Sequence, residues 1–272
     1  MDTLPEINRQ SLAPNPLAGH PLATVNLQLL PRYALERMAK AGGAVIGWHE
    51  VLHKSRDSIV GYLLAGEATP GDFDHVPAGD VVDETTGSQY FFHRHADDPH
   101  DPHGDEIGHF HCFVRAPVQH RDGTVDFEPP TRAIGHCVAG HTDGHGGHGL
   151  SHLVAISIDA LGLPCRLFTT NRWVTGETWR PAKSMVPLID DFAITHGQPN
   201  FIVNQWLTEM IRLFRPQIIG LLEQRDLRLA GISDAPLATH LTDHQVEIVT
   251  TCDITVPDQI AAITAALALC DD

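Results

Sequence analysis

The chain has 272 residues, enough for one large domain or two small ones, and its 42% hydrophobic content is ordinary for a globular protein. Its 34 acidic and 18 basic residues give a net charge of −16, which argues against nucleic acid or an anionic membrane surface as a partner. From the residues at its N-terminus we expect no secretory signal, and no apolar run approaches the ~18 residues of a membrane span. Because the five cysteines form no Cys-x-x-Cys pair, we expect a reduced, cytoplasmic protein.

The predicted elements begin after a Pro-rich segment, residues 1–24, which we expect to be an extended arm. Apolar residues at helical spacing predict a first helix over 25–42, ended by Gly42-Gly43, and a second helix over 44–54. After Gly66 the pattern changes to short β-like runs separated by loops, at 73–77, 88–95, 108–115, 152–159 and 165–170. The last two runs resemble a hairpin with Gly162 in its turn.

Helical periodicity returns near Ser184 with a short helix, followed by a long helix over 201–227 that Pro216 should kink. A strand over 246–251 and a helix over 257–269 complete the chain. These elements predict one α+β domain over 25–272, in which a central antiparallel β-sheet or small barrel-like sheet is flanked by N- and C-terminal helices. Residues 116–151 are predicted to be a flexible insertion rich in histidine and glycine.

Histidines are concentrated in the middle of the chain, where 12 of the 19 fall between His93 and His152. Two predicted strands carry them at alternate positions, His93 and His95 in one, His109 and His111 in the other. Alternate side chains of a strand share a face, and the neighbouring phenylalanines indicate that this face is buried. If the two strands are antiparallel neighbours, the imidazoles converge. Because neutral imidazole is the commonest metal ligand, the pattern predicts a metal site.

Two further side chains can complete this site. Glu106 comes just before the second strand, and His152 opens a third predicted strand. Two histidines with one carboxylate are the ligands of non-haem iron oxygenases, whereas three or four histidines suit zinc or copper. We therefore predict a divalent transition metal, with iron preferred. Its candidate ligands are His93, His95, Glu106, His109, His111 and His152.

A polar segment, Asn171-Arg172-Trp173-Val174-Thr175-Gly176-Glu177-Thr178-Trp179, follows the strands. Arg172 can clamp a substrate carboxylate or phosphate, or it can pair with Glu177 in a structural role. Together with the runs 89–95 and 106–111, this segment resembles a bacterial family known as a domain of unknown function. The resemblance covers roughly residues 25–225 and implies no activity.

A competing motif lies in the predicted N-terminal helix. His49-Glu50-Val51-Leu52-His53 matches the His-Glu-x-x-His pattern, in which two imidazoles bind zinc and the glutamate acts as general base. Zincin proteases normally have an uncharged residue after the second histidine, and this chain has Lys54. The alternative interpretation is an amphipathic helix with these residues on its polar side.

The leading hypothesis is a metalloenzyme acting on a small molecule, with a non-haem iron oxygenase as the specific candidate and Glu106 and Arg172 as candidate catalytic residues. One alternative is a non-catalytic metal carrier, store or sensor. It would use the same strands and the glycine-histidine tract at 135–148, which is otherwise a surface loop. The other alternative is a zinc hydrolase that uses His49 and His53.

Overall fold

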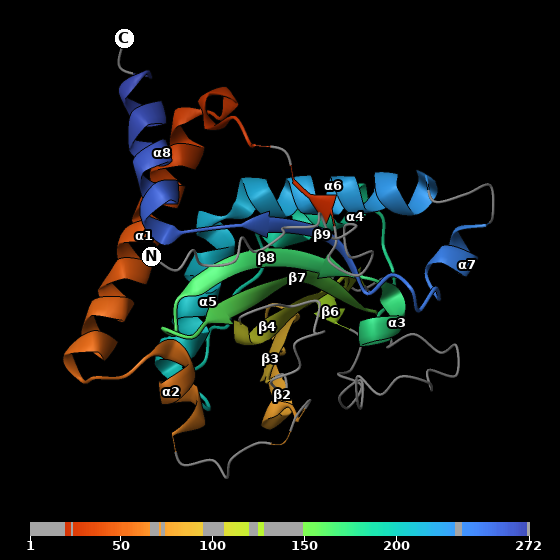
Figure 1. The fold of residues 1–272 in the computed structure, drawn as a ribbon, viewed down its shortest axis with the longest axis horizontal. Coiled ribbons are helices and arrows are strands. Elements are labelled where there is room, and N and C mark those ends of the chain that lie inside the picture. Colours follow the sequence, from red (N-terminus) through yellow and green to blue (C-terminus); the bar gives the residue numbers. More distant parts are fainter. Residues whose placement is uncertain are drawn as a thin grey trace, which may run out of the picture.

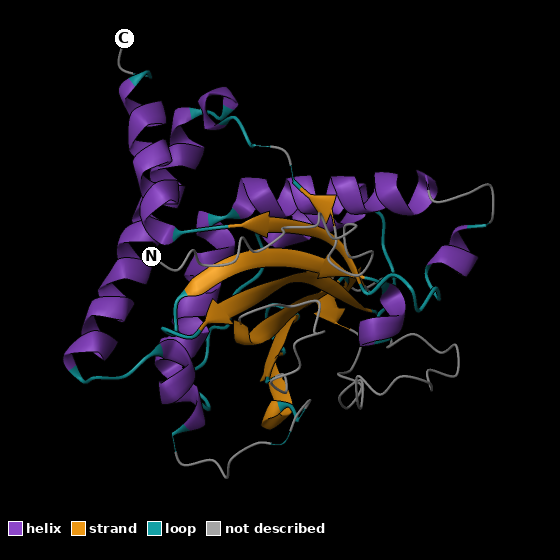
Figure 2. Ribbon diagram, in the orientation of Figure 1, coloured by secondary structure: helices purple, strands orange, loops and turns teal. Residues whose placement is uncertain are grey.

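The protein is an α+β fold that combines an open sheet with helices from both ends of the chain, as the sequence predicts (Figures 1 and 2). This architecture comes from a computed structural model. The structure describes residues 20–22, 24–65, 71, 74–94, 106–119, 125–127, 149–231 and 236–270. The predicted arm over 1–24 therefore lies almost entirely outside the described residues.

The central sheet has seven strands in the order β1-β9-β8-β7-β4-β3-β2. Its pairs are antiparallel except that β1 (His20–Pro21) runs parallel to β9. The other strands are β2 (Val76–Asp83), β3 (Ser88–His93), β4 (Glu106–Arg115), β7 (Leu150–Asp159), β8 (Pro164–Thr170) and β9 (Ile248–Asp253). A separate two-stranded sheet, β5 (Pro117–Gln119) with β6 (Val125–Phe127), lies within the predicted insertion.

Helices precede, interrupt and follow the strands. The bounds are α1 (Arg32–Lys54), α2 (Ile59–Leu64), α3 (Arg172–Thr175), α4 (Ala182–Ile189), α5 (Phe201–Leu213), α6 (Arg215–Gly231), α7 (Leu237–His240) and α8 (Val256–Ala268). A 3₁₀ turn, Leu27–Leu29, comes before α1. None of the described helices combines the length and apolarity that crossing a membrane requires.

The prediction that Gly42-Gly43 ends the first helix is wrong, because α1 continues without a break from Arg32 to Lys54. Gly42 is buried where α1 packs on α8, and a Cβ atom there would lie 2.8 Å from Cγ1 of Ile260. A Cβ on Gly43 would meet nothing within 4 Å. Gly42 therefore serves the close approach of two helices, not the end of one.

The predicted long helix is also two helices, since α5 ends at Leu213 and α6 begins at Arg215. Pro216 lies in the first turn of α6, where its missing N–H removes no intrahelical hydrogen bond. The proline therefore starts a new helix instead of kinking an existing one.

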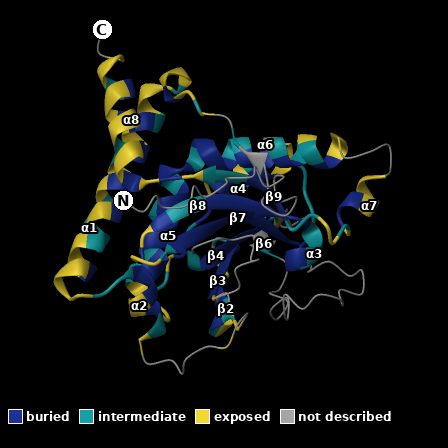
Figure 3. Cartoon of the chain, viewed as in Figure 1, coloured by how far each residue is buried: buried dark blue, intermediate teal, exposed yellow. Residues whose placement is uncertain are grey.

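The two faces of the sheet have different surroundings. Tyr90, Phe110 and Ile156 point to one face, where they share the main hydrophobic core with residues of α1, α4, α5 and α6. Phe113 and Phe168 point to the other face and belong to two small separate clusters. We call these the helix face and the histidine face. Strands β4, β7 and β8 are buried (Figure 3), so both faces of the central strands lie inside the protein.

A buried carboxylate joins the β2–β3 turn to the loop between α4 and α5. Asp83 accepts hydrogen bonds from the backbone N–H groups of Thr85 (2.9 Å) and Thr86 (3.1 Å). It also accepts from the N–H (2.5 Å) and hydroxyl (2.6 Å) of Thr195. Burial alone would raise the pKa of Asp83, but these hydrogen bonds outweigh burial and lower it.

Candidate metal centre

The predicted neighbours β3 and β4 do pair antiparallel, and their register places the histidines together. His93 lies opposite His109, and Phe91 lies opposite His111. Directly opposed residues in a sheet share a face, so three imidazoles project side by side from the histidine face. His95, predicted as a fourth member, lies outside the described residues.

The three imidazoles meet through their Nε2 atoms. His93 Nε2 lies 2.6 Å from His109 Nε2, which in turn lies 2.9 Å from His111 Nε2. Each residue is only 1–2% exposed. One ligand nitrogen from each lies within 4.8 Å of the others, and we call these residues the histidine triad.

This convergence is difficult to satisfy with hydrogen bonds alone. A neutral imidazole has one lone pair, which cannot accept two linear hydrogen bonds at once, and His109 Nε2 contacts two other Nε2 atoms. A shared cation removes the conflict, because all three lone pairs can then point to it. Three imidazoles around a tetrahedral zinc ion would have Nε2 atoms about 3.3 Å apart, given Zn–N bonds of about 2.0–2.1 Å. Loading would therefore separate the rings by only roughly half an ångström.

Glu106 reaches the histidine face through a β-bulge. In a regular strand it would point away from His109, three residues further on. Between Glu106 and Gly108 the register with β7 shifts, so that Ile107 is an extra residue and points to the helix face. Glu106 Oε1 consequently lies 2.5 Å from His109 Nδ1. A carboxylate on this nitrogen fixes the tautomer that leaves the Nε2 lone pair toward the other imidazoles.

His152 reaches the same face through a second bulge, in β7. Cys112 pairs with Val154 and Phe113 pairs with His152, which leaves Leu153 as the extra residue. His152 Nε2 lies 3.0 Å from His111 Nδ1, on the side of that ring away from the triad contact. The structure therefore places both Glu106 and His152 behind triad histidines, as orienting partners.

The surroundings of His152 keep it neutral and fixed. Burial, with a smaller contribution from the Arg225 cation, lowers the pKa of His152 to about 3. Its Nδ1 lies 3.4 Å from the Thr170 hydroxyl, and its backbone N–H donates to Glu177 Oε2 at 2.5 Å. Burial raises the pKa of Glu177 to about 7, although Arg225 opposes that shift. A neutral His152 can accept a hydrogen bond from Nδ1 of His111.

Aromatic side chains border the triad. The ring of Phe91 lies 5.0 Å from that of His111, and the ring of Phe168 lies 4.9 Å from that of His109. Ser157 lies opposite His109 on β7 and is fully buried. The triad is thus in a largely apolar environment, which strengthens the attraction between a bound cation and nearby carboxylates.

The segment that contains Arg172 mainly supports the fold. Asn171 Nδ2 donates to the carbonyls of His240 (2.8 Å) and Asp243 (3.3 Å), and Trp173 Nε1 donates to Val246 (2.9 Å). These bonds hold the loop that precedes β9. The charge of Arg172 acts on Glu177, and none of the described hydrogen bonds joins its side chain to the triad.

Sequence reasoning missed a second polar pair on the histidine face. His75 Nδ1 lies 2.8 Å from Asp80 Oδ1, and the His75 ring stacks on Phe91 with 3.6 Å between centroids. Both residues lie in an irregular part of β2 and the segment before it, where side-chain alternation gives no signal. The adjacent Gly79, which indicates a bulge in a strand pattern, was the available clue.

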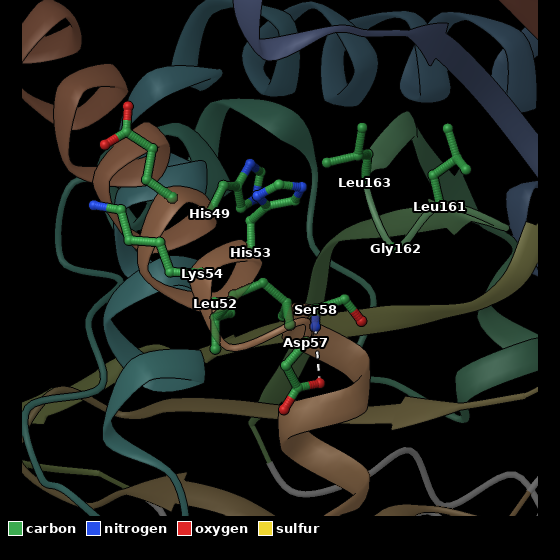
Figure 4. A pocket seen from close by; sticks show the side chains of 11 residues that line it. His49, Leu52, His53, Lys54, Asp57, Ser58, Leu161, Gly162 and Leu163 are labelled. Atoms are coloured by element: carbon green, nitrogen blue, oxygen red, sulfur yellow. Dashed lines mark hydrogen bonds between the residues drawn. The ribbon is translucent and has the colours of Figure 1, made fainter.

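The His-Glu-x-x-His residues lie on α1, as that motif requires, beside a pocket of about 360 Å³. Figure 4 shows His49 and His53 projecting toward the β7–β8 turn with Leu161 and Leu163. His49 Nε2 accepts a hydrogen bond from Trp206 Nε1 (2.9 Å), and burial lowers the pKa of His49. Because an indole N–H can only donate, this contact uses the Nε2 lone pair that zinc would need. The zinc-hydrolase hypothesis therefore lacks a ligand atom in this structure.

The comparisons with known proteins agree with the resemblance noted in the sequence. A family model described as a domain of unknown function, DUF6969, matches residues 39–254, which include the triad, Glu106 and His152. No curated protein and no solved structure matches the chain. Since the match covers most of its length, the chain belongs to the DUF6969 family.

Proposed function

We infer that the protein is a mononuclear metalloenzyme in which His93, His109 and His111 bind one divalent transition metal. The observation that carries this proposal is the meeting of three buried Nε2 atoms at 2.6 and 2.9 Å, two of them backed at Nδ1 by Glu106 and His152. Metal-ligating histidines almost always donate their other ring N–H to such a partner.

Within the part of the chain that the structure describes, the triad supplies three ligands, which leave at least one coordination position for another molecule; an open position is the mark of a catalytic rather than a structural metal site. The charge balance points the same way. Counting the described residues, a dication with three neutral imidazoles and the carboxylate of Glu106 keeps a net positive charge in a buried site. An anionic ligand such as hydroxide or a deprotonated substrate would neutralise it. The substrate we propose is therefore a small molecule that binds the metal through an anionic oxygen.

The choice of metal depends on Glu106. Three imidazoles with an outer carboxylate form the ligand set of a catalytic zinc site. The two-histidine, one-carboxylate set of the iron oxygenases needs Glu106 to turn from His109 to the metal. The contact at 2.5 Å to His109 Nδ1 favours zinc over iron for the arrangement seen here.

Metal analysis of protein purified without an affinity tag tests the proposal. We expect the wild type to hold one ion per chain and His109→Ala to lose it. His49→Ala, which removes a histidine of the rival motif, is the matched control and should retain the ion. Retention of full metal content by His109→Ala would refute the triad as the site. Loss in His49→Ala alone would support the zinc-hydrolase alternative.

A second measurement separates enzyme from carrier. On cobalt-substituted protein, an exchangeable small ligand such as azide should change the absorption spectrum, because at least one position is held by solvent. Several weakly held ions per chain, or a spectrum that no added ligand alters, would favour the carrier, store or sensor.

A further inference from the structure

A buried chain of polar residues lies beside the triad on the histidine face. His75 Nδ1 and Asp80 Oδ1 are 2.8 Å apart, and their side chains are 9% and 2% exposed. Asp80 Oδ2 accepts from Gln89 Nε2 at 2.6 Å, and Gln89 in turn accepts a hydrogen bond from Arg115 Nη2. The Arg115 cation thus supports the Asp80 carboxylate through Gln89, and the carboxylate holds His75.

The backbone at Asp80 is held in an uncommon conformation. Its φ is +61°, and Gly79 before it has φ +94°. For a residue with a side chain the left-handed region is strained, and such strain collects at functional sites. Here it accompanies a register shift between Val76 and Val81 and brings the carboxylate to His75.

The other nitrogen of His75 is the unusual one. Nε2 is buried, and the described residues offer it no hydrogen-bond partner. Since a carboxylate can only accept, the proton of the neutral ring belongs on Nδ1, which leaves a lone pair on Nε2. Most buried ring nitrogens of histidines have a hydrogen-bond partner. An aspartate–histidine pair with a buried, unoccupied lone pair has the form of a general base.

The pair is adjacent to the proposed metal centre. The His75 ring stacks on Phe91 at 3.6 Å with an interplanar angle of 9°. The Phe91 ring lies 5.0 Å from the ring of His111 and 5.7 Å from that of His93. His75 is therefore separated from two triad histidines by a single aromatic side chain.

We propose that His75 accepts a proton from a weak acid that binds the metal through oxygen, and that Asp80 is its positioning residue. The ligand class is a small molecule with an ionisable O–H, such as an alcohol, a hydroxamic acid or water. In this step the O–H bond breaks, the oxygen keeps the electron pair and bonds to the metal, and the proton passes to His75 Nε2 through one bridging water, because the Phe91 ring lies between His75 and the triad. No oxidant or reductant is needed. The proposal rests on the metal centre proposed above.

The test uses cobalt(II)-loaded full-length protein and two probes, acetohydroxamic acid and azide, at about pH 7.5. At this pH acetohydroxamic acid is largely protonated and azide is an anion. Only acetohydroxamic acid therefore needs a base that takes up its proton when it binds the metal. The variants are His75→Asn, which keeps an N–H for Asp80, and Asp80→Asn. His196→Asn is the matched control: among the residues that the structure describes, His196 also has one bonded and one unpartnered ring nitrogen, and its bonded partner is the Val82 carbonyl and not a carboxylate.

We expect cobalt affinity to stay within about twofold in every variant. His75→Asn should weaken the binding of acetohydroxamic acid by about tenfold or more, since a tenfold change in an equilibrium constant corresponds to one pKa unit. The same substitution should leave azide binding within about twofold. Asp80→Asn should change in the same direction, and His196→Asn should match the wild type. Calorimetry in two buffers of different ionisation enthalpy should show that the wild type retains the proton and His75→Asn releases it to the buffer.

The outcomes separate this proposal from the metal centre. Reduced cobalt affinity in His75→Asn would make His75 a ligand, and equal weakening of both probes would make its role structural. Either result overturns the proton-acceptor role. If His75→Asn does not fold, the wild-type calorimetry still decides, because release of a full proton to the buffer overturns the proposal. Absence of cobalt binding by the wild type would overturn the metal centre itself.

Discussion

Replacing Glu106 by glutamine tests whether the carboxylate orients a ligand or is a ligand. The substitution preserves the shape and an acceptor oxygen for His109 Nδ1 but removes the charge. Oε1 lies 2.5 Å from Nδ1, and the two side chains are only 1–2% exposed, so solvent screens their interaction little. Across the ring to a metal the charge separation is roughly 6.5 Å, which gives about 5 kcal/mol for a dication at an effective dielectric constant of about 20.

That figure is an upper limit, because it counts the Coulomb attraction alone and leaves out the desolvation and relaxation that accompany metal binding. Outer partners of metal-bound histidines typically contribute about 10- to 100-fold in affinity, or about 1.4–2.7 kcal/mol. We therefore expect Glu106→Gln to weaken zinc binding by that factor, measured by competition with a chromophoric chelator. Glu209→Gln, which removes a carboxylate paired with Arg212 on α5, is the control and should bind as the wild type. Unchanged affinity in Glu106→Gln would refute the orienting role, and a loss as large as that of His109→Ala would show direct ligation.

Three predictions concern the framework and are measured by urea unfolding. Gly42→Ala should destabilise the protein by about 1–3 kcal/mol, because the added Cβ would crowd Ile260. Gly43→Ala, which meets no neighbour, should stabilise it by about 0.5–1 kcal/mol. Equal effects of the two substitutions would contradict the packing assigned to α1 and α8. Asp83→Asn should cost about 2–3 kcal/mol at pH 7. Folding lowers the pKa of Asp83, so the difference in stability between the wild type and Asp83→Asn is fully present above the unfolded pKa near 3.8. It should shrink as the pH falls below 3.8 and disappear once the pH passes the lower pKa of the folded state. A constant difference down to about pH 2 would be inconsistent with an ionised Asp83. Asn171→Ala should cost about 2 kcal/mol and speed proteolysis of the loop before β9, and an unaltered cleavage rate would count against its role in holding that loop.

The histidine face could be predicted because strand alternation is a strict period of two. His109 and His111 share a face for that reason, and the phenylalanines beside them indicated burial. Pairing with His93 followed from the proximity of two runs in the chain. The structure pairs the two strands and aligns His93 with His109, a register that the sequence did not specify.

The positions of Glu106 and His152 could not be derived from the same rule, which sends both to the helix face. Each is returned to the triad by one extra residue, Ile107 or Leu153. A β-bulge is decided by the pairing partner and the packing on both faces, so local propensity does not reveal it. Gly108 was the one sequence clue, and its φ of +149° and close approach to the His93 carbonyl account for the glycine.

The helix errors have a similar cause. Glycine and proline both disfavour a helix by themselves. At Gly42 the packing of α1 on α8 outweighs that preference, and Pro216 lies in the first turn of a helix, where proline is tolerated. Intrinsic propensity is worth about 1 kcal/mol at a glycine, which a well-packed interface such as that of α1 with α8 readily outweighs.

The two bulges have a consequence for how this centre can change during divergence of the family. Deleting Leu153 or Ile107 would shift the end of that strand by one residue, so that its side chains change faces of the sheet. His152 or Glu106 would then point into the hydrophobic core, although the sequence would still contain every histidine of the triad. Single-residue insertions and deletions, more than substitutions, would then switch the centre between complete and dismantled forms. The spacing between Glu106 and His109, and the length of β7 after His152, are accordingly the characters by which an intact centre can be distinguished from one that keeps only its residues.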